Sequence, residues 1–400
     1  MRIKIVLFVV VFFISVACGR DNSSFTLNVK LDNCADSSVL YLNNTFEGYG
    51  IDTAYLVNGI AQLNGSVSTP CYVSLVCDAN AVVDGQRETD FKKVYRINFY
   101  IENSQISVSA DVNTLDSPWL DESIKTEPAI IMGSKTEDLN QEYLASVRSI
   151  NDELAKVYAS FSKEYYMPKY EGRPVNDSLA ISLVKEEIAL NTLKDKICND
   201  FIYNNPKTVV AKDLAIMNFN DRSKPLTISN IDSVASALNK YWSHKPEFVN
   251  FASIVEKAKK MAIGATLDDV TLFNLNGEQV SLKEYIPQGK YVLLEFWASW
   301  CSPCRAEIPH LKHINKMYSG DDFAIVSVSV DDNDQAWKNA VLQEDMSWTQ
   351  LRNPNGNKGG AVEEYGIDGV PFCVLLDKSG KVCNVNMRGP YLDAFVDTLK

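Results

Sequence analysis

The sequence lacks the excess of positive charge that nucleic-acid-binding proteins carry. It contains 39 Lys and Arg residues against 51 Asp and Glu residues, so its formal net charge at pH 7 is −12. Binding to nucleic acid, or to an anionic membrane surface through charge alone, would require clustered basic side chains. We therefore expect no nucleic-acid partner.

Long apolar segments are also missing after the N-terminus. Arg2 and Lys4 precede an uncharged stretch, Ile5 to Ala17, that is rich in Val, Phe and Ile. This stretch is too short for a membrane-spanning helix and has the layout of a secretory signal. Because no later segment is long and apolar enough to span a bilayer, we expect an exported chain.

Small residues stand directly before a cysteine at the end of this stretch, in the order Ser15-Val16-Ala17-Cys18. The pattern resembles the lipobox of bacterial lipoproteins, in which the cysteine is lipidated and becomes the new N-terminus. The resemblance implies a signal peptide over residues 1–18, a membrane anchor on Cys18 and a periplasm-facing place in the cell envelope. The alternative is simple cleavage and free secretion, since Ser15 stands where a bulky aliphatic residue is commonest.

The pattern along the chain changes twice, as expected for a chain of 400 residues. Residues 25–130 alternate in polarity, and the Asn58-Gly59 turn signal predicts a hairpin between residues 53–57 and 60–63. This pattern predicts an antiparallel β-sandwich. The strands of this region contain no His and no compact pair of acids, so we expect a structural or partner-binding module. Residues 136–262 have apolar residues at helical spacing, and residues 264–400 alternate strands with helices, which predicts a helical middle region and a C-terminal α/β domain.

Two cysteines separated by two residues stand where a strand expected at 291–297 meets a helix. The segment reads Trp297-Ala298-Ser299-Trp300-Cys301-Ser302-Pro303-Cys304-Arg305. A zinc site would need a second pair of ligands, and haem attachment would need His in place of Arg305. At such a junction, backbone N–H groups and the helix dipole favour a thiolate. The pattern therefore predicts a redox dithiol that needs neither metal nor cofactor.

Residues 264–400 resemble the thioredoxin superfamily. The resemblance rests on the dithiol segment with Glu307-Ile308-Pro309 after it, on the Asn276-Gly277 hairpin and on Gly369-Val370-Pro371 before a strand. It is strongest to the membrane-tethered, TlpA-like thiol–disulfide oxidoreductases of bacterial envelopes. The domain order behind a lipoprotein signal also resembles multidomain envelope lipoproteins of Bacteroides-type bacteria.

The resemblance implies a role for several residues of the dithiol region. Cys301 is expected to be the solvent-facing nucleophile, and Cys304 the more buried thiol that resolves the mixed disulfide. Pro371 corresponds to the cis-proline of the family, beside which Val370 can pair with an extended peptide. Trp300 is expected to contact the substrate.

Two acids also correspond to positions of the family. Glu295 matches a buried acid that can accept the proton of Cys304, and the alternative is a carboxylate turned to solvent. Glu307 matches an acid that tunes the thiols in some relatives, and the alternative is an ordinary surface residue. His310 and His313, on the same expected helix, are interpreted as surface or packing residues.

The other six cysteines form no regular framework: Cys34, Cys71, Cys77, Cys198, Cys373 and Cys383. Cys71 and Cys77 lie roughly 20 Å apart along one expected strand, so they cannot bond to each other, but either could pair with Cys34. The turn expected at Asp377 to Gly380 places Cys373 opposite residue 384, so a disulfide from Cys373 to Cys383 is not expected.

The sequence therefore predicts an envelope thiol–disulfide oxidoreductase that works through a Cys-Ser-Pro-Cys dithiol. The family's strongly oxidising members have a His between the cysteines, and its absence here favours a disulfide reductase. Expected partners are disulfide-containing exported proteins and an upstream membrane electron donor. Two alternatives stay open, namely a thiol peroxidase and a non-enzymatic binding or assembly lipoprotein with a redox-sensing thioredoxin-like domain.

Overall fold

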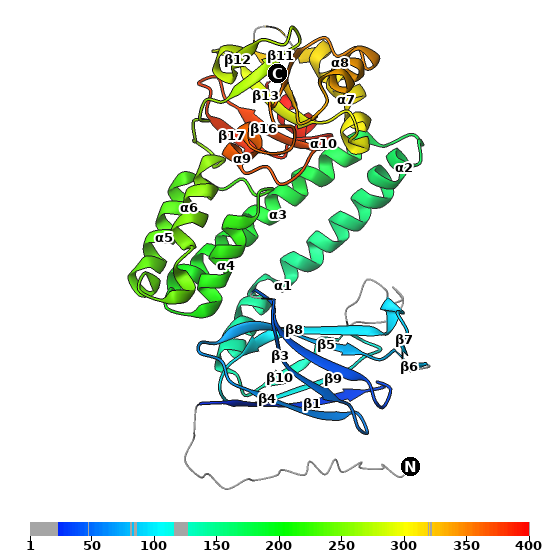
Figure 1. The fold of residues 1–400 in the computed structure, drawn as a ribbon, viewed down its shortest axis with the longest axis vertical. Coiled ribbons are helices and arrows are strands. Elements are labelled where there is room, and N and C mark those ends of the chain that lie inside the picture. The colour runs from blue at the N-terminus through cyan, green and yellow to red at the C-terminus, as the bar shows by residue number, and fades with distance from the viewer. Residues whose placement is uncertain are drawn as a thin grey trace, which may run out of the picture. The chain divides into compact units, whose positions relative to one another are not determined.

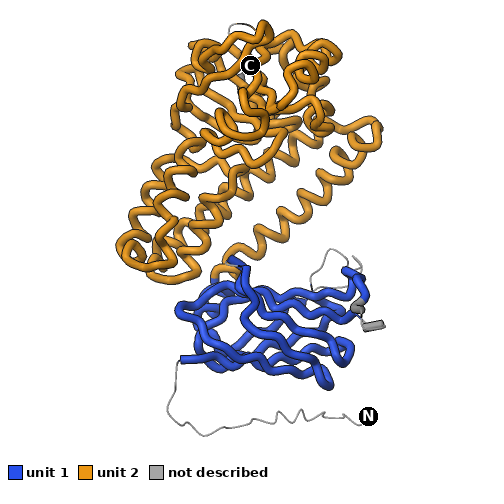
Figure 2. Tube along the Cα trace, viewed as in Figure 1, with its two compact units in different colours: residues 1–142 blue, residues 143–400 orange. Residues whose placement is uncertain are grey.

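The protein is described by a computed structural model that covers residues 23–399 except residues 47, 81, 84–85, 116–126, 319 and 321. The expected signal peptide and Cys18 lie outside the described residues. The chain divides into two compact units, Met1–Glu142 and Tyr143–Lys400 (Figure 2). No helix of the described part combines the length and the apolar character needed to cross a membrane. The expected domain boundaries at 130–136 and 262–264 stay predictions.

The first unit is built mainly of strands (Figure 1). One four-stranded sheet has the order β10-β9-β1-β4, and another has the order β3-β2-β5-β8. A short pair, β6 and β7, lies between β5 and β8 in the sequence. The strands are β1 (Phe25–Asp32), β2 (Val39–Asn44), β3 (Gly50–Tyr55), β4 (Ile60–Gly65), β5 (Cys71–Asp78), β6 (Val82–Val83), β7 (Gln86–Arg87), β8 (Val94–Ile101), β9 (Gln105–Asp111) and β10 (Ile130–Met132). Alternate residues of β1 are buried, and they share one apolar cluster with Leu40 and Leu42 of the other sheet. A β-rich N-terminal region is therefore confirmed.

One strand pair of this unit is not antiparallel, which corrects the expected arrangement. β1 runs parallel to β9, with Leu27 opposite Ile106, while its other neighbour β4 is antiparallel. Between β1 and β9 the chain passes through β4 of the same sheet and through β2, β3, β5 and β8 of the other sheet. This crossover lets β9 return in the same direction as β1, which a tight hairpin could not do.

The Asn58-Gly59 turn is present, although the hairpin expected around it is incomplete. Both residues have positive φ values, 52° and 72°, and Val57 and Ile60 bridge across the turn. Beyond that bridge, β3 and β4 enter different sheets. The turn signal was thus right about the local backbone and wrong about the strand pairing.

Helices form the first part of the second unit, which confirms a helical middle region. They are α1 (Lys135–Phe161), which begins in the first unit, α2 (Met167–Tyr170), α3 (Asp177–Asn204), α4 (Val209–Asn220), α5 (Ile228–Trp242) and α6 (Phe251–Lys260). The side chains of Asn176, Thr208 and Thr227 accept backbone N–H bonds at the starts of α3, α4 and α5. Such caps satisfy N–H groups that have no partner inside the helix, and so define where each helix begins.

A seven-stranded mixed sheet of order β12-β11-β15-β14-β13-β16-β17 forms the rest of the second unit (Figure 1). Its strands are β11 (Thr271–Asn274), β12 (Gln279–Ser281), β13 (Tyr291–Trp297), β14 (Phe323–Ser329), β15 (Thr349–Arg352), β16 (Phe372–Leu376) and β17 (Val382–Val385). Its helices are α7 (Ser302–Tyr318), α8 (Asp334–Gln343), α9 (Gly360–Tyr365) and α10 (Pro390–Val396). β13 is parallel to β14 and antiparallel to β16, as a central mixed sheet requires.

Apart from Glu295, the central strand β13 is apolar on both faces because each face packs in a core. Leu293 and Trp297 belong to one cluster with residues of α7 and α10, whereas Val292, Leu294 and Phe296 belong to another. A strand covered on both sides reads as a continuous apolar run, as residues 291–297 do. The end of β13 is thereby held firmly where the dithiol begins.

The register of the last hairpin corrects the expectation for Cys373. Val374 pairs with Val385, and an irregularity follows between Leu375 and Leu376. The N–H of Asn386 donates to the carbonyl of Cys373 at 2.7 Å, so Cys373 lies opposite residue 386 and not residue 384. A bulge and a longer turn than expected account for the shift. Cys373 and Cys383 are both free thiols.

Candidate active site

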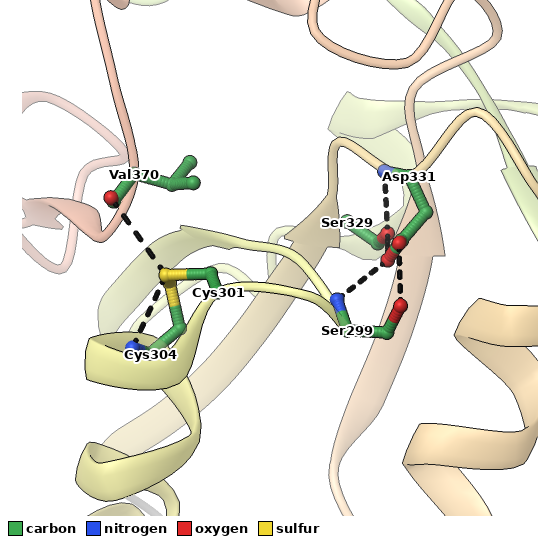
Figure 3. The surroundings of a disulfide bond; sticks show 6 residues. All are labelled: Ser299, Cys301, Cys304, Ser329, Asp331 and Val370. Atoms are coloured by element: carbon green, nitrogen blue, oxygen red, sulfur yellow. Dashed lines mark hydrogen bonds between the residues drawn. A yellow bond between two sulfur atoms is a disulfide. The ribbon is translucent and has the colours of Figure 1, made fainter.

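Cys301 and Cys304 form a disulfide where β13 ends and α7 begins (Figure 3). Cys301 directly precedes Ser302, the first residue of α7. The backbone N–H of Cys304 points at the Cys301 sulfur, with 3.2 Å between nitrogen and sulfur. When the disulfide is reduced, this N–H and the positive end of the helix stabilise a thiolate on Cys301.

The exposure of Cys301 corrects one expectation. Cys301 is 4% exposed and Cys304 is 0% exposed, so Cys304 is the more buried of the two but Cys301 does not face solvent in the disulfide form. Trp297 and Ala298 pack in the same buried cluster as both cysteines. By contrast, the neighbouring Trp300 is 63% exposed, so a large aromatic surface stands next to the dithiol.

The loop before β16 lies directly beside the dithiol. The Val370–Pro371 peptide bond is cis, as expected. The carbonyl oxygen of Val370 lies 3.7 Å from the Cys301 sulfur (Figure 3). The fold thus brings the Gly369-Val370-Pro371 segment to the first cysteine, although the two are far apart in the sequence.

A buried carboxylate that was not singled out from the sequence, Asp331, holds the loop that leads to Cys301. Asp331 accepts bonds from the backbone N–H of Ser299 at 2.8 Å and from its hydroxyl at 2.6 Å (Figure 3). The Ser329 hydroxyl donates to the same carboxylate at 2.7 Å, and Arg352 donates to the Asp331 carbonyl at 3.2 Å. A signal existed in the sequence, because parallel β13 and β14 end at one edge and an acid follows β14.

Glu295 is buried on the face of the sheet that carries the dithiol. Side chains two apart on a strand share a face, and Leu293 and Trp297 pack in the cluster that contains Cys301 and Cys304. The alternative of a solvent-turned carboxylate is therefore wrong. Glu295 accepts a bond from the Ser327 hydroxyl at 2.5 Å, and that hydroxyl accepts one from Trp348 at 2.8 Å.

Burial raises the pKa of Glu295 to about 7, although the Ser327 hydroxyl opposes the rise. The negative charge of Glu307 adds to it. A carboxyl group that titrates near neutral pH can both take and return a proton. Glu295 thus has the acidity that a proton acceptor for a thiol requires.

Glu307 is buried, so the alternative of an ordinary helix-surface residue is wrong. Its carboxylate accepts bonds from the Gly389 N–H at 2.8 Å and from Lys169 Nζ at 3.2 Å, and it lies 2.8 Å from His310 Nδ1. The other ring nitrogen of His310 lies 2.8 Å from Asp393. The acid therefore joins α7 to α10 and to the segment around α2.

The charged groups of this network shift one another's pKa values. Burial would raise the pKa of Glu307, but the hydrogen bond and charge of His310, with Lys169 and the Gly389 N–H, lower it to about 2. Burial would lower the pKa of His310, but Asp393 and Glu307 raise it to about 9. At neutral pH, Glu307 is a carboxylate and His310 is an imidazolium. His310 is a packing residue with a fixed charge, while Lys169 and Asp393 were not singled out from the sequence.

No group of three or more His, Cys, Asp or Glu side chains in the described part of the chain is arranged to hold a metal ion. The candidate site consists of the dithiol, the Val370 loop and the buried acids. Together they can break and form sulfur–sulfur bonds and can move the accompanying proton.

Two family models match the chain. A thioredoxin-like model matches residues 289–382, and a model of a domain of unknown function (DUF4369) matches residues 25–140. The matched regions correspond to the sheet around the dithiol and to the strand-rich first unit.

Curated relatives match the C-terminal part. The thiol-disulfide oxidoreductase ResA of Bacillus cereus is 31% identical over 135 residues, which cover 34% of this chain and 75% of the relative. The thioredoxin-like protein YneN of Bacillus subtilis is 31% identical over 127 residues, which cover 31% of this chain and 71% of the relative.

Solved structures with similarity to the chain include the thioredoxin domain of a thiol-disulfide oxidoreductase from Bacteroides vulgatus. It is 33% identical and covers 34% of this chain and 97% of that domain, with a TM-score of 0.32. The Bacillus cereus relative is matched over three quarters of its length at 31% identity. The chain therefore belongs to the TlpA-like thiol–disulfide oxidoreductases of the thioredoxin superfamily.

Proposed function

We propose that this thiol–disulfide oxidoreductase is a disulfide reductase of the cell envelope, which acts on exported proteins through Cys301 and Cys304. The proposal rests on the groups that surround the dithiol. The Cys304 N–H meets the Cys301 sulfur at 3.2 Å, and a buried acid with a pKa of about 7 lies on the same side of the sheet. Ser302 and Pro303 place no cation between the cysteines, which disfavours a strong oxidant.

The reaction would start from the reduced dithiol. The Cys301 thiolate attacks one sulfur of a client disulfide, that disulfide breaks, and a mixed disulfide forms while the released client thiolate takes a proton. An extended client segment would pair with the Val370 backbone and contact Trp300. Both groups lie next to Cys301, because the Val370 oxygen is 3.7 Å from its sulfur and Trp300 precedes it in the chain.

The second step would be resolution by Cys304. Its thiol gives its proton to the Glu295 carboxylate, and the resulting thiolate attacks the Cys301 sulfur. The Cys301–Cys304 disulfide forms and the second client sulfur leaves with a proton. An upstream membrane dithiol would then supply two electrons and two protons to restore the reduced state. Glu307 would act at a distance, through the charge that helps to raise the pKa of Glu295.

The reduction potential of the dithiol tests the direction of the reaction. Equilibration of the purified chain in thiol–disulfide buffers, followed by mass spectrometry of the trapped cysteines, should give a value near or below that of thioredoxin, about −270 mV. A value near about −120 mV, typical of a strong oxidase, would contradict a reductase. A Cys304→Ser variant should accumulate mixed disulfides with exported proteins, whereas Cys301→Ser should not.

We also infer that the chain is anchored by a lipid on Cys18 and that the two sheets of the first unit form a β-sandwich which binds a partner or supports the rest. The shared apolar cluster of the two sheets supports the sandwich. The anchor rests on the lipobox-like sequence before Cys18. Metabolic labelling with a fatty acid should mark the wild type and not a Cys18→Ala variant. Equal labelling of the two proteins would contradict a lipid anchor on Cys18.

A further inference from the structure

A second pair of thiols lies in the first unit, between Cys34 and Cys77. Their sulfur atoms are 3.2 Å apart, and both cysteines are free. Cys34 belongs to the loop between β1 and β2, and Cys77 belongs to β5, where it pairs with Leu40 of β2. A disulfide has a sulfur–sulfur distance of roughly 2.05 Å, so a movement of about 1 Å would close the bond.

The part of the loop that directly follows Cys34 is fixed in place by hydrogen bonds. The Ser37 N–H donates to the Leu56 carbonyl at 3.0 Å, and the Ser38 hydroxyl donates to the Ala35 carbonyl at 2.5 Å. The Asp36 carboxylate accepts the Asn58 N–H at 2.7 Å. The hydrogen-bonded loop therefore holds Cys34 next to Cys77, and the short distance between the two sulfur atoms is a feature of the fold.

The two thiols differ in exposure and acidity. Cys34 is partly exposed and Cys77 is buried. A hydrogen bond from Cys77 is the main cause that lowers the pKa of Cys34, and the Ser38 hydroxyl adds to it while burial opposes it. The pKa of Cys77 is raised by the same contact and by burial. Cys34 is thus the thiol that ionises first and that an outside reagent can reach.

We propose that Cys34 and Cys77 are a second redox-active pair, which an external disulfide converts into a bond between the β1–β2 loop and β5. The Cys34 thiolate attacks one sulfur of oxidised glutathione or of a protein disulfide, that disulfide breaks, and one thiolate leaves and takes a proton. Cys77 then loses its proton to solvent, its thiolate attacks the Cys34 sulfur, and the second thiolate leaves. Two protein thiols lose two electrons and two protons, and the oxidant gains them as two thiols.

This pair is separate from the dithiol at α7, because it belongs to the other compact unit. The proposal does not depend on whether Cys301 and Cys304 act as a reductase. Its effect would be on the first unit, since a covalent link between residues 34 and 77 restricts the unfolded chain.

The test uses the full exported chain with Cys301→Ser and Cys304→Ser, so that the other dithiol cannot contribute. The protein is equilibrated with oxidised glutathione, free thiols are alkylated, and the linked peptides are identified by mass spectrometry. Trypsin cannot separate the cysteines because residues 31–86 contain no Lys or Arg, so digestion after Glu47 and then with chymotrypsin is needed. We expect a Cys34–Cys77 link, retained in a Cys71→Ser control.

Two further measurements keep the proposal falsifiable. Under reducing conditions, Cys34 should be alkylated by iodoacetamide at least tenfold faster than Cys77 at pH 7. Oxidation should raise the melting temperature of the first unit by several degrees, and Cys34→Ser should abolish that rise. A Cys34–Cys71 link, or two thiols that stay free at an excess of oxidised glutathione, would overturn the proposal.

Discussion

Glu295 and Glu307 are both buried acids, yet their pKa values move in opposite directions. Glu295 has a single neutral hydroxyl donor, so burial dominates and its pKa rises to about 7. Glu307 has a cationic Lys169 and His310 beside it, and these outweigh burial and lower its pKa to about 2. The partners therefore separate a group that can exchange protons from one that keeps a fixed charge.

A Glu295→Gln variant should slow the resolution of the mixed disulfide by about 10²-fold at pH 7, because it removes the proton acceptor. In the wild type the rate of this step should rise with pH through about 7, as the carboxyl group ionises. Stopped-flow measurement of the step against pH checks both points. Ser327→Ala is the matched control, because loss of its hydroxyl should move the inflection to higher pH. An unchanged inflection in Glu295→Gln would remove Glu295 from the mechanism.

Asp331 should matter for stability as well as for the position of the dithiol loop. Asp331→Ala leaves the N–H and hydroxyl of Ser299 without their buried acceptor, so we expect a loss of about 2–3 kcal/mol in the free energy of unfolding of the second unit. A loosened loop should also lower kcat/KM about tenfold.

Urea unfolding and the reduction rate of a small disulfide measure these two effects. Ser299→Ala removes only the hydroxyl and should cost about 1 kcal/mol. The exposed neighbour Asp332 gives the control, since Asp332→Ala should change little. If both aspartates gave equal losses, Asp331 would have no special part in holding the loop.

At the scale of elements, the His310 network ties α7 to α10 and gives the second unit a dependence on pH. The pKa of His310 is raised to about 9 in the folded chain. The stabilisation of the fold by the charged ring is therefore fully present below the ordinary pKa of His, near 6.5, and is lost as the pH rises through about 9. The pKa of Glu307 is lowered, so the stabilisation of the fold by its carboxylate is present above about pH 4.5 and is lost as the pH falls towards about 2.

A His310→Gln variant should therefore lose its stability deficit at alkaline pH. Relative to the wild type, we expect it to be less stable by about 2–3 kcal/mol at pH 6 and by much less at pH 10. Urea unfolding of both proteins across this pH range gives the difference in their free energies of unfolding. Because Glu295 is present in both proteins, its titration cancels in this difference. A deficit that did not change with pH would mean that the ring acts by packing and not by charge.

The sequence predicted those elements that short segments encode. The dithiol at a strand–helix junction and the Asn276-Gly277 hairpin depend on neighbouring residues, and the cis Val370–Pro371 bond was expected from the resemblance to the family. The parallel pairing of β1 with β9 could not be predicted in this way, because period-two alternation reveals the buried face of a strand but not its partner. The bulge in the last hairpin escaped prediction for a similar reason, since no local residue type marked it.

Side-chain networks were harder still to predict. Glu295 could be expected to be buried because it stands inside an apolar strand. The role of His310 could not, because it depends on Asp393 of α10 and on Glu307, which in turn bonds Lys169, far earlier in the chain. Asp331 likewise gains its role only when β14 lies beside β13. Chemistry-bearing residues were thus recognisable, while the contacts that tune them required the fold.

At the scale of the whole molecule, the two compact units have separate cores, in which Leu27 and Leu293 are fully buried. Calorimetry should therefore resolve two unfolding transitions. Leu27→Ala should lower only one of them and Leu293→Ala only the other, each by about 2–5 kcal/mol in the free energy of unfolding. Leu27→Ala should still reduce a small disulfide at the wild-type rate. One shared transition that both variants lower equally would show that the units fold as a single body.

The position of β1 inside its sheet has a mechanical consequence. β1 lies inside its sheet, between β4 and β9, and it is the first strand of the described chain. A lengthwise pull on the N-terminus would load the hydrogen bonds to both neighbours at once, and so would meet them in shear and not one after another. An edge strand in the same place would have hydrogen bonds to only one neighbour to resist the same pull. β1 is thus a strand suited to bear tension.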